Sequence, residues 1–360
     1  MALSTALPPG STIGILGGGQ LGRMLALAAA QLGLKCHIYA PEADSPAFQV
    51  AAMHTIADYL DPKALAKFAA SVDVVTYEFE NVPVDAVIQL EALVAVRPGA
   101  HALATAQDRL KEKSLAQALG ARTADFRAVN NVDELRSALA QLGLPAILKT
   151  TRMGYDGKGQ VKISKLDDAA AAWLALHGAP AILEQFVPFM NEVSVIAARG
   201  GDGSFAAYDV AENVHRNHIL HTSTVPAHLN SGLVDEAVAI TRRILDRLEY
   251  VGVAGVEFFV GSDGLYVNEL APRVHNSGHW TQDACLVSQF EQHIRAIAGW
   301  PLGNVVRHSE VVMTNLLGAA IDDWASLAGE PGVAVHVYGK AEARDGRKMG
   351  HFNRITSRKT

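Results

Sequence analysis

The sequence predicts an α/β protein that begins with a doubly wound parallel sheet and ends with a small β-rich part. Three patterns support this prediction: a strand, glycine turn and helix at the start of the chain, a glycine-rich loop after an apolar strand near residue 150, and a β-hairpin near residue 260. With 360 residues the chain exceeds the length at which one hydrophobic core usually divides. We therefore expect two or three domains.

The first part of the chain carries the pattern of the parallel sheet. A strand, a glycine turn, a helix and further strands follow one another, as in parallel sheets whose strands are joined by crossover helices. The expected elements are a strand at 12–16, a turn at 17–22, a helix at 23–32 and strands at 35–39 and 72–77. This domain should end near residues 100–106.

From Asp108 the pattern changes to a mixture of helices and antiparallel strands. Helices are expected at 107–119, 167–177, 233–248 and 288–298. Strands are expected at 145–150, 160–163, 181–185, 192–199, 205–212, 253–260 and 265–269, the last two forming a hairpin around the turn 261–264. Pro301 opens the β-rich C-terminal part.

Composition excludes several classes of function. The net charge of −6 argues against a general nucleic-acid or anionic-membrane surface. Cys36 and Cys285 lack the spacing of a disulfide scaffold or metal site, which indicates a reducing compartment. No stretch offers the ~20 apolar residues of a membrane span, and the first ten residues lack the pattern of a signal peptide. We therefore expect a cytoplasmic protein.

The C-terminal segment is basic although the whole chain is acidic. From Val337 onward seven Lys or Arg residues stand against two acidic ones. Such a segment is either a solvated tail or a site for a small phosphate.

The turn of residues 17–22 matches the pattern G-x-G-x-x-G between a strand and a helix. Helix N-terminal amides in such a turn can bind phosphate, and Glu42 lies 20 residues past Gly22, where a ribose-binding acid would stand. Three interpretations remain open. The turn holds a dinucleotide of a dehydrogenase, it holds another phosphorylated or ribosylated substrate, or its glycines only permit a tight crossing.

The second motif joins a lysine to a flexible loop. Lys149 ends an apolar strand, and Gly154, Gly157 and Gly159 follow in the next ten residues. Glycine lets backbone approach phosphate oxygens closely, and lysine supplies a compact charge, so the segment suits the lid of a nucleotide site. The loop lacks the G-K-[ST] ending of a Walker motif. The alternative is an exposed hairpin turn.

The third motif is a pair of carboxylates in apolar strands. Glu257 and Glu269 lie on the two strands of the expected hairpin, where burial is costly unless they are paired or bind a metal. Together they offer hard oxygen ligands for Mg²⁺. Simple counting from Gly261 and Gly264 places Asn268 opposite Glu257, whereas a one-residue bulge places Glu269 there. A shared metal requires the bulged register. Otherwise Glu257 is a solvent-facing strand residue.

With these motifs the chain resembles an ATP-grasp enzyme. Within that superfamily, residues 19–24, 76–82, 155–159, 268–280 and 346–351 are closely similar to the family of 5-(carboxyamino)imidazole ribonucleotide synthases, and they occur in the same order. The resemblance covers nearly the whole chain. It implies an N-terminal domain over 1–106, an ATP-grasp domain over 107–300 with a lid at about 123–187, and a C-terminal domain over 301–360.

The family uses ATP and bicarbonate to form carboxyphosphate and then carboxylates the exocyclic amine of 5-aminoimidazole ribonucleotide, a step of purine biosynthesis. The resemblance implies a cytoplasmic homodimer that requires Mg²⁺, or Mn²⁺ in its place, at Glu257 and Glu269. It implies that Arg273, His275 and Asn276 orient bicarbonate and stabilise carboxyphosphate. The implied ATP contacts are Arg109, Lys149, Gly154, Tyr155, Asp156, Gly157, Lys158, Gly159, Gln160, Glu184, Gln185, Phe186, Val187, Glu192, His215, Asn268 and Glu269.

The ribonucleotide then accounts for the glycine turn and for the basic C-terminal segment. The implied contacts are Gln20, Glu78, Tyr155, Asp156, Lys158, Lys340 and Arg347. One departure concerns the superfamily, in which many members carry Asn two residues after the second metal glutamate. Ala271 stands there in this chain, and Asn268 is the candidate substitute.

Three alternatives remain beside this hypothesis. Another ATP-grasp ligase, such as a formate-dependent ribonucleotide transformylase or a biotin carboxylase, would share most motifs. An NAD-dependent dehydrogenase would use the turn 17–22 and Glu42. A non-catalytic nucleotide sensor would not need Glu257, Glu269 and Arg273.

Overall fold

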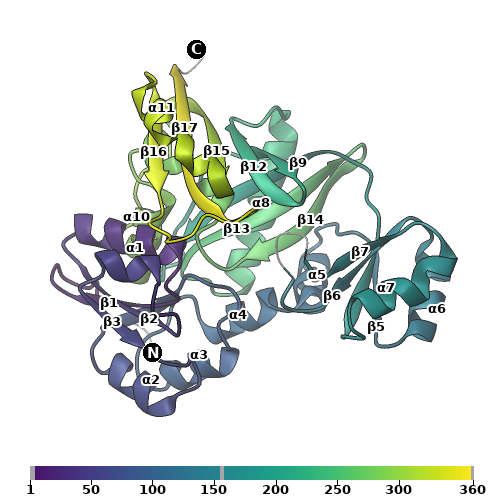
Figure 1. Ribbon diagram of the computed structural model, residues 1–360, viewed down its shortest axis with the longest axis horizontal. Helices are drawn as coiled ribbons and strands as arrows, with labels where there is room; N and C mark the ends of the chain where they lie inside the picture. Colours follow the sequence, from purple (N-terminus) through teal and green to yellow (C-terminus); the bar gives the residue numbers. More distant parts are fainter. Residues whose placement is uncertain (1–4, 155–157, 358–360) are drawn as a thin grey trace.

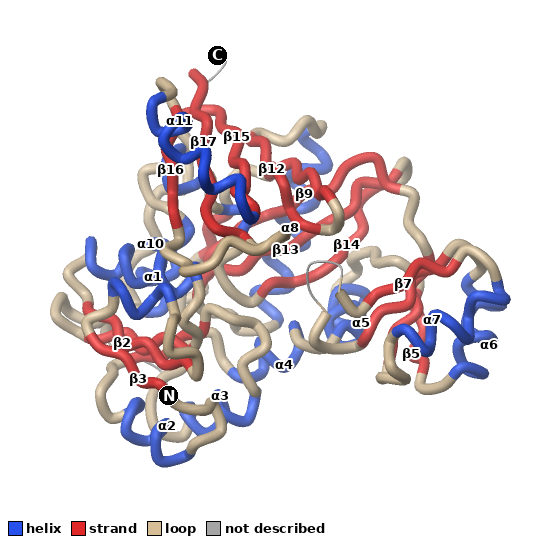
Figure 2. The backbone as a smooth tube through the Cα atoms, in the orientation of Figure 1, coloured by secondary structure: helices blue, strands red, loops and turns tan. Residues whose placement is uncertain are grey.

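The computed structural model describes residues 5–154 and 158–357 and arranges them around three β-sheets (Figures 1 and 2). The N-terminal sheet lies at the purple end of the chain, the large central sheet runs through the middle, and a small sheet lies apart on the right of the view. In the described part of the chain, no helix combines the length and apolar character needed to cross a bilayer.

The N-terminal sheet has four parallel strands in the order β3-β2-β1-β4. Ile13 and Ile15 pack in the cluster that includes helix α1, whereas Val75 and Tyr77 pack in the cluster of α2 and α3. Helices therefore cover both faces, and the expected doubly wound sheet is confirmed. Its elements are β1 (Thr12–Leu16), α1 (Gln20–Gln31), β2 (Lys35–Ala40), η1 (Pro46–Val50), β3 (Met53–Ile56), α2 (Pro62–Ala69), β4 (Val74–Tyr77), α3 (Val84–Glu91) and α4 (Ala100–Ala106).

The central sheet is antiparallel and has the order β14-β13-β9-β11-β12-β15-β17-β16, with β10 paired to β9. Apolar side chains of β9, β13 and β14 pack against α8 on one face. The opposite face of β13 carries Glu257. The strands of this sheet before residue 300, and the helices around it, are α5 (Arg109–Ala118), β9 (Phe189–Arg199), β10 (Phe205–Ala207), β11 (Ala211–Arg216), β12 (Ile219–Val225), α8 (Ser231–Arg247), β13 (Gly252–Gly261), β14 (Gly264–Ala271), η3 (Asn276–Gly278), α9 (Thr281–Ala284) and α10 (Gln289–Ile297).

The third sheet, here called the lid sheet, comprises four antiparallel strands in the order β5-β8-β6-β7. Its core is formed with two helices, through residues such as Leu135, Leu139 and Ala172. Its elements are β5 (Phe126–Val129), α6 (Val132–Leu142), β6 (Ala146–Thr150), β7 (Gln160–Ile163), η2 (Leu166–Asp168), α7 (Ala169–Ala175) and β8 (Ala181–Gln185).

The C-terminal part is rich in β-structure, as expected, and it extends the central sheet. Strand β15 pairs with β12, so the sheet continues across the expected boundary at residue 300. The elements are β15 (Ser309–Leu317), η4 (Gly318–Asp323), α11 (Trp324–Gly329), β16 (Val333–Val337) and β17 (Lys348–Ser357). The boundaries at 106 and 300 remain predictions.

Several expected elements have other bounds in the structure: the helix expected at 167–177 is divided into η2 and α7, and β9 begins at Phe189 rather than at residue 192. Two further differences have a local cause. Helix α1 begins at Gln20 rather than Arg23, because Gly22 packs inside the first turn against the backbone oxygen of Gly17. The strand expected at 205–212 is divided into β10 and β11, which pair with different parts of β9. Between them the side chain of Tyr208 enters the core and donates a hydrogen bond to the Val287 carbonyl, which turns the chain out of the strand.

Candidate active site

The hairpin of β13 and β14 brings Glu257 and Glu269 directly opposite each other. The turn closes Gly261 on Gly264, and the register shifts between Glu257 and Phe258, so that Asn268 is the extra residue of a β-bulge. Because paired residues of an antiparallel ladder point to the same face, both carboxylates lie on one side of the sheet. This is the register that a shared metal requires.

The electrostatics of this pair fit a divalent cation. Burial and the nearby Glu269 carboxylate raise the pKa of Glu257. The Oδ1 atom of Asn268 is buried without a hydrogen-bond partner. Within residues 5–154 and 158–357, no group of three His, Cys, Asp or Glu side chains is arranged to hold a metal. Two carboxylates and an amide oxygen are a donor set suited to Mg²⁺, which usually takes its other ligands from phosphates and water.

Three cationic side chains surround this hairpin from α5 and the lid sheet. Arg109 Nη1 lies 3.3 Å from Glu269 Oε2. Lys149 Nζ donates to Glu184 Oε2 at 2.8 Å, and Lys113 Nζ lies 3.3 Å from the other oxygen of Glu184. Although burial opposes ionisation of Glu184, Lys149 and Lys113 hold the pKa of its carboxyl group at about 2. One carboxylate thus neutralises only one of two buried lysines.

Lys113 is a site residue that the sequence does not reveal. Its side chain is only 1% exposed, and it also donates to the backbone oxygen of Asn268 at 3.2 Å. In a charged helix such as residues 107–119, a lysine usually faces solvent. The tertiary contacts with Glu184 of β8 and Asn268 of β14 show that this lysine faces inward.

The segment after β6 and the loop after β4 meet at a small cavity of about 60 Å³. Arg109 Nη2 donates to the carbonyl of Gly154 at 3.4 Å, and Arg152 donates to Gln107 Oε1. The amide nitrogen of Gln107 in turn donates to the backbone carbonyls of Glu80 and Val82. Gln107 therefore connects the loop after β4 to the start of the glycine-rich loop that follows β6.

Arg273 forms a partly buried ion pair with Glu80, a residue that sequence analysis did not select. Burial opposes ionisation of Glu80, but the guanidinium holds the pKa of this carboxyl group at about 2. Glu80 lies two residues past Glu78 in the same loop, and this spacing was the available signal. Asn276 exchanges two amide hydrogen bonds with Asn315 of β15, at 3.0 and 2.8 Å. Both interactions restrain side chains expected to bind bicarbonate.

His275 lies between Glu257 and the buried interior. Its Nε2 atom is 3.4 Å from Glu257 Oε1. Burial, with Arg273 next, lowers the pKa of His275 to about 3, so its imidazole is neutral at pH 7.

The glycine turn is occupied by a carboxylate of the same chain. Glu78 Oε1 accepts a hydrogen bond from the Gly19 amide at 2.9 Å, and Oε2 accepts one from the Gly22 amide at 3.2 Å. Gly17 adopts a φ of 106°, and a Cβ there would clash with Glu78. These are the amides on which a dinucleotide would place its pyrophosphate, so the arrangement disfavours the dehydrogenase alternative. Gln20 begins helix α1 beside them.

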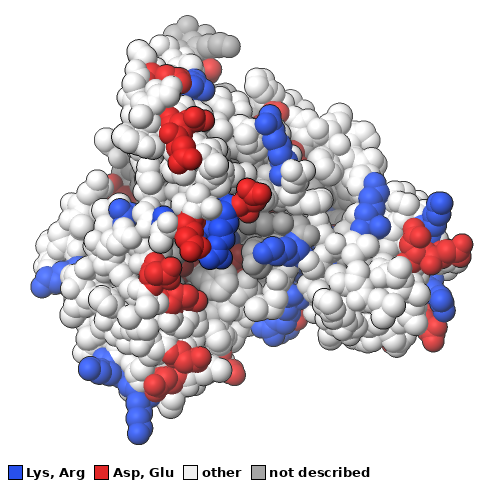
Figure 3. All heavy atoms as spheres, in the orientation of Figure 1, with Lys and Arg blue, Asp and Glu red and all other residues white. Residues whose placement is uncertain are grey.

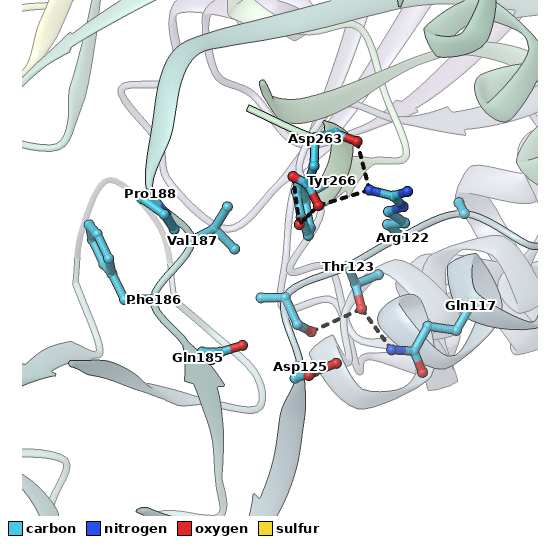
Figure 4. Close-up of a pocket in the computed structure, with 12 residues that line it drawn as sticks. Gln117, Arg122, Thr123, Asp125, Gln185, Phe186, Val187, Pro188, Asp263 and Tyr266 are labelled. Atoms are coloured by element: carbon cyan, nitrogen blue, oxygen red, sulfur yellow. Dashed lines mark hydrogen bonds and ion pairs between the residues drawn. The ribbon is translucent and has the colours of Figure 1, made fainter. Parts of the chain in front are cut away.

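The linker between β8 and β9 borders a cavity of about 520 Å³ (Figure 4). Gln185 and Val187 point toward this space, whereas Phe186 turns away from it, and Lys162 Nζ lies 4.6 Å from the Phe186 ring centre. On the far side Arg122 pairs with Asp263 at 3.0 Å. The cavity therefore lies between the two chain segments that connect the lid sheet to the rest of the molecule.

The other expected nucleotide contacts lie on the central sheet and lid sheet. Glu192 Oε2 is 3.0 Å from His215 Nδ1, and although burial opposes it, this carboxylate raises the pKa of His215. Gln160 begins β7, next to Gly159 and the exposed Lys158. Tyr155, Asp156 and Gly157 lie outside the described residues.

Lys340 and Arg347, expected to contact the ribonucleotide and here called the phosphate clamp, lie in the loop between β16 and β17. Lys340 Nζ donates to the carbonyl of Lys348 at 2.7 Å, and Arg347 donates to the carbonyl of Glu342 at 3.0 Å. Sequence analysis did not select Lys348, although its charge acts on both Glu257 and His275. Figure 3 shows basic and acidic side chains side by side at the centre of this face, where the N-terminal, central and C-terminal parts meet.

Comparisons with known proteins agree with this architecture. Residues 11–107 match the ribonucleotide synthetase preATP-grasp domain, residues 114–290 match the ATP-grasp domain, and residues 311–360 match the phosphoribosylaminoimidazole carboxylase C-terminal domain.

Two curated relatives carry the same name, N5-carboxyaminoimidazole ribonucleotide synthase. The protein from Brucella melitensis is 54% identical over 98% of this chain and 99% of its own length. The protein from Bacillus subtilis is 44% identical over 96% of this chain and 91% of its own length.

Solved structures give the same result. An ADP complex of an N5-carboxyaminoimidazole ribonucleotide synthetase superposes with a TM-score of 0.95 at 45% identity, covering 99% of this chain and 95% of that one. The enzyme from Aspergillus clavatus, in complex with ADP and 5-aminoimidazole ribonucleotide, superposes with a TM-score of 0.91 at 30% identity, covering 97% and 94%. The chain therefore belongs to the N5-carboxyaminoimidazole ribonucleotide synthase family of ATP-grasp enzymes.

Proposed function

We propose that this protein is an ATP-dependent carbon–nitrogen ligase that carboxylates the exocyclic amine of 5-aminoimidazole ribonucleotide, with bicarbonate as the carbon source. The observation that carries the proposal is the facing pair Glu257 and Glu269, with Arg109 against Glu269 and Lys149 paired to the neighbouring Glu184. Two facing carboxylates with cationic side chains nearby suit a metal-bound triphosphate, for which catalysis is mainly positioning and charge neutralisation.

In this proposal the nucleotide lies between the central sheet and the lid sheet. Lys149 and Arg109 bind phosphate oxygens, and Glu257, Glu269 and Asn268 hold Mg²⁺ or Mn²⁺, which would neutralise charge on the phosphates when bound. The linker residues Glu184, Gln185, Phe186 and Val187 contact adenine, and Glu192 and His215 contact the ribose side. The lid residues Gly154, Lys158, Gly159 and Gln160, together with Tyr155, Asp156 and Gly157, cover the phosphates.

Bicarbonate is a poor electrophile, and phosphorylation gives it a leaving group. Arg273, His275 and Asn276 orient bicarbonate so that one of its oxygens attacks the γ-phosphorus, ADP leaves, and carboxyphosphate forms. The ion pair of Arg273 with Glu80 and the amide pair of Asn276 with Asn315 restrain two of these groups before substrate binds. Such preorganisation lowers the cost of reaching the reactive geometry.

The carboxyl group then passes to the amine of the ribonucleotide, the amine loses a proton, and inorganic phosphate leaves. We propose that Gln20, Glu78, Tyr155, Asp156 and Lys158 bind the aminoimidazole ribonucleotide and that Lys340 and Arg347 bind its phosphate. The basic C-terminal segment and the glycine turn thereby serve one substrate. The product is a labile carbamate, so exclusion of water by the lid is useful.

We also propose that the enzyme works in the cytoplasm as a homodimer. Cys36 and Cys285 are buried and not joined in a disulfide, which suits a reducing compartment.

The test is ADP release by the purified protein with Mg-ATP. It should require bicarbonate, be stimulated by 5-aminoimidazole ribonucleotide, and incorporate labelled bicarbonate into product. Glu269→Gln should abolish turnover, whereas Glu236→Gln on the exposed face of α8 should not change it. Turnover that depends on formate, or hydride transfer with NADH, would replace this function by one of the alternatives.

A further inference from the structure

A chain of buried polar side chains leads from the middle of the central sheet to His275. Ser223 Oγ donates to Asn213 Oδ1 at 2.7 Å, and Asn213 Nδ2 donates to Ser194 Oγ at 2.9 Å. Ser194 Oγ lies 2.7 Å from Ser277 Oγ, which lies 2.8 Å from His275 Nδ1. The four side chains that lead to His275 in this hydrogen-bonded chain are at most 5% exposed. Buried polar groups are costly unless every member of the network is satisfied.

The sheet register builds this chain. Asn213 of β11 is paired with Ser223 of β12, and Ser194 of β9 is paired with Glu257 of β13. The chain therefore runs along the face of the sheet that carries the metal-site carboxylate, one strand at a time. Ser277, from η3, lies over this face and connects the strands to His275.

The contacts determine which nitrogen of His275 carries the proton. The backbone amide of Ser277 donates to His275 Nδ1 at 3.3 Å, so that His275 caps the short helix η3 with its own ring. An amide N–H can only donate, and Nδ1 must therefore be unprotonated. In the neutral imidazole the single proton then lies on Nε2, which faces Glu257.

This tautomer also fixes the direction of the hydroxyl bonds. Since Nδ1 accepts, the hydroxyl of Ser277 must donate to it. Ser277 has only one hydroxyl proton, so Ser194 donates to Ser277 Oγ. Asn213 then donates to Ser194, and all four bonds point from the sheet toward the ring. The assignment for Nδ1 depends only on the Ser277 amide and holds whichever way the Asn213 amide is turned.

We infer that Ser277 is a positioning residue, supported by Ser194 and Asn213, which holds His275 as the neutral tautomer protonated at Nε2. The consequence of this tautomer for catalysis rests on the proposed function. His275 offers an N–H donor to the site and keeps no lone pair on that side.

The consequence concerns the chemistry open to His275. Its Nε2 is 3.4 Å from Glu257 Oε1, beyond normal hydrogen-bond length, so this N–H is available to an oxygen of bicarbonate or carboxyphosphate. The only basic nitrogen, Nδ1, is occupied by two donors on the interior side. His275 therefore donates a hydrogen bond during carboxylation and does not take the proton from the amine.

The direct test is ¹⁵N NMR of the histidine side chains in the metal-free, full-length protein. His275→Gln identifies the signal of His275 by its disappearance. We expect a signal with a protonated Nε2 and an unprotonated Nδ1 at neutral pH. An Nδ1-protonated ring or an imidazolium would overturn the inference even if the enzyme is active, and this measurement depends on no activity. Conversely, an absence of bicarbonate-dependent ADP release would contradict the proposed function but would leave the assignment of the tautomer unchanged.

The second test asks whether the hydrogen-bonded side chains act together on His275. Ser277→Ala should lower kcat by about tenfold while the KM for ATP stays unchanged, as for other residues that orient a ligand-binding group. Ser194→Ala should lower kcat by less than Ser277→Ala does. The double variant should lower kcat by no more than Ser277→Ala alone. Thr241→Val removes an equally buried hydroxyl bond in α8 and should leave kcat unchanged. Additive losses would show that the two serines act separately and would overturn the coupling.

Discussion

Glu257 on β13 stands directly opposite Glu269 on β14, although counting from the hairpin turn places Asn268 there. The bulge at Asn268 moves the second carboxylate onto the face of the first. Burial and the proximity of Glu269 raise the pKa of Glu257, so the pair is electrostatically unfavourable without a cation. The hairpin thus keeps an arrangement that costs stability, as expected if the proposed metal binds there.

Glu257→Gln should therefore separate stability from metal binding. Without metal, the variant should melt about 2 °C above the parent, because it removes a buried carboxylate that Glu269 repels. Its stabilisation by Mg-ATP and its ADP release should be lost. Thermal unfolding with and without Mg-ATP checks both expectations, with Glu236→Gln as the surface control. Parent-like stabilisation by Mg-ATP would contradict the metal assignment.

Sequence patterns predicted most elements of this fold because the strands are apolar and the turns carry glycine. Residues 160–163 and 181–185 are strands with the expected bounds. The register of the hairpin could not be predicted, since the bulge depends on long-range contacts such as the bond from Lys113 to the Asn268 carbonyl. Glu80 and Lys113 were missed for the same reason. A charged residue in a loop or helix is usually solvated, and only the folded structure shows that these two are paired inside.

Glu80→Gln should raise the KM for bicarbonate more than the KM for ATP. The side chains of Arg273 and Glu80 are 15% and 27% exposed, so loss of the carboxylate leaves a largely buried guanidinium without its counter-charge. We expect a rise of about tenfold in the KM for bicarbonate and a smaller change in the KM for ATP. Steady-state kinetics with each substrate varied measure this. Equal effects on both constants would mean that Glu80 only stabilises the fold.

Lys340→Ala should mainly raise the KM for the ribonucleotide, because Lys340 is proposed to bind its phosphate. Its ammonium group is directed by the Lys348 carbonyl at 2.7 Å. A lost phosphate contact of this kind is worth about 2 kcal/mol, or roughly 30-fold in KM. Arg354→Ala, on β17 and paired with Glu330, is the control for loss of a basic side chain in the same C-terminal segment. A change confined to the KM for ATP would refute the phosphate clamp.

His293 makes the stability of the protein pH-dependent. It is fully buried, accepts the Val253 amide at Nδ1 at 3.0 Å, and lies 2.8 Å from Thr76 Oγ1 through Nε2. It thereby joins the strand before Glu78 to the strand that carries Glu257. Burial lowers the pKa of His293 to about 3. The unfolded chain binds a proton near pH 6.5, whereas the folded protein does not until the pH approaches 3.

The contribution of His293 to stability is therefore complete above pH 6.5 and falls as the pH is lowered from 6.5 toward 3. At pH 5 the loss is about 2 kcal/mol for this one histidine. His293→Gln should be less stable than the parent at pH 7, but the difference should shrink by that amount at pH 5. Urea unfolding at both pH values measures it, with the exposed His101→Gln as control. If the difference stayed constant between pH 7 and 5, His293 would take up its proton over the same pH range in the folded protein as in the unfolded chain. Its Nδ1 could then not accept the Val253 amide at pH 5.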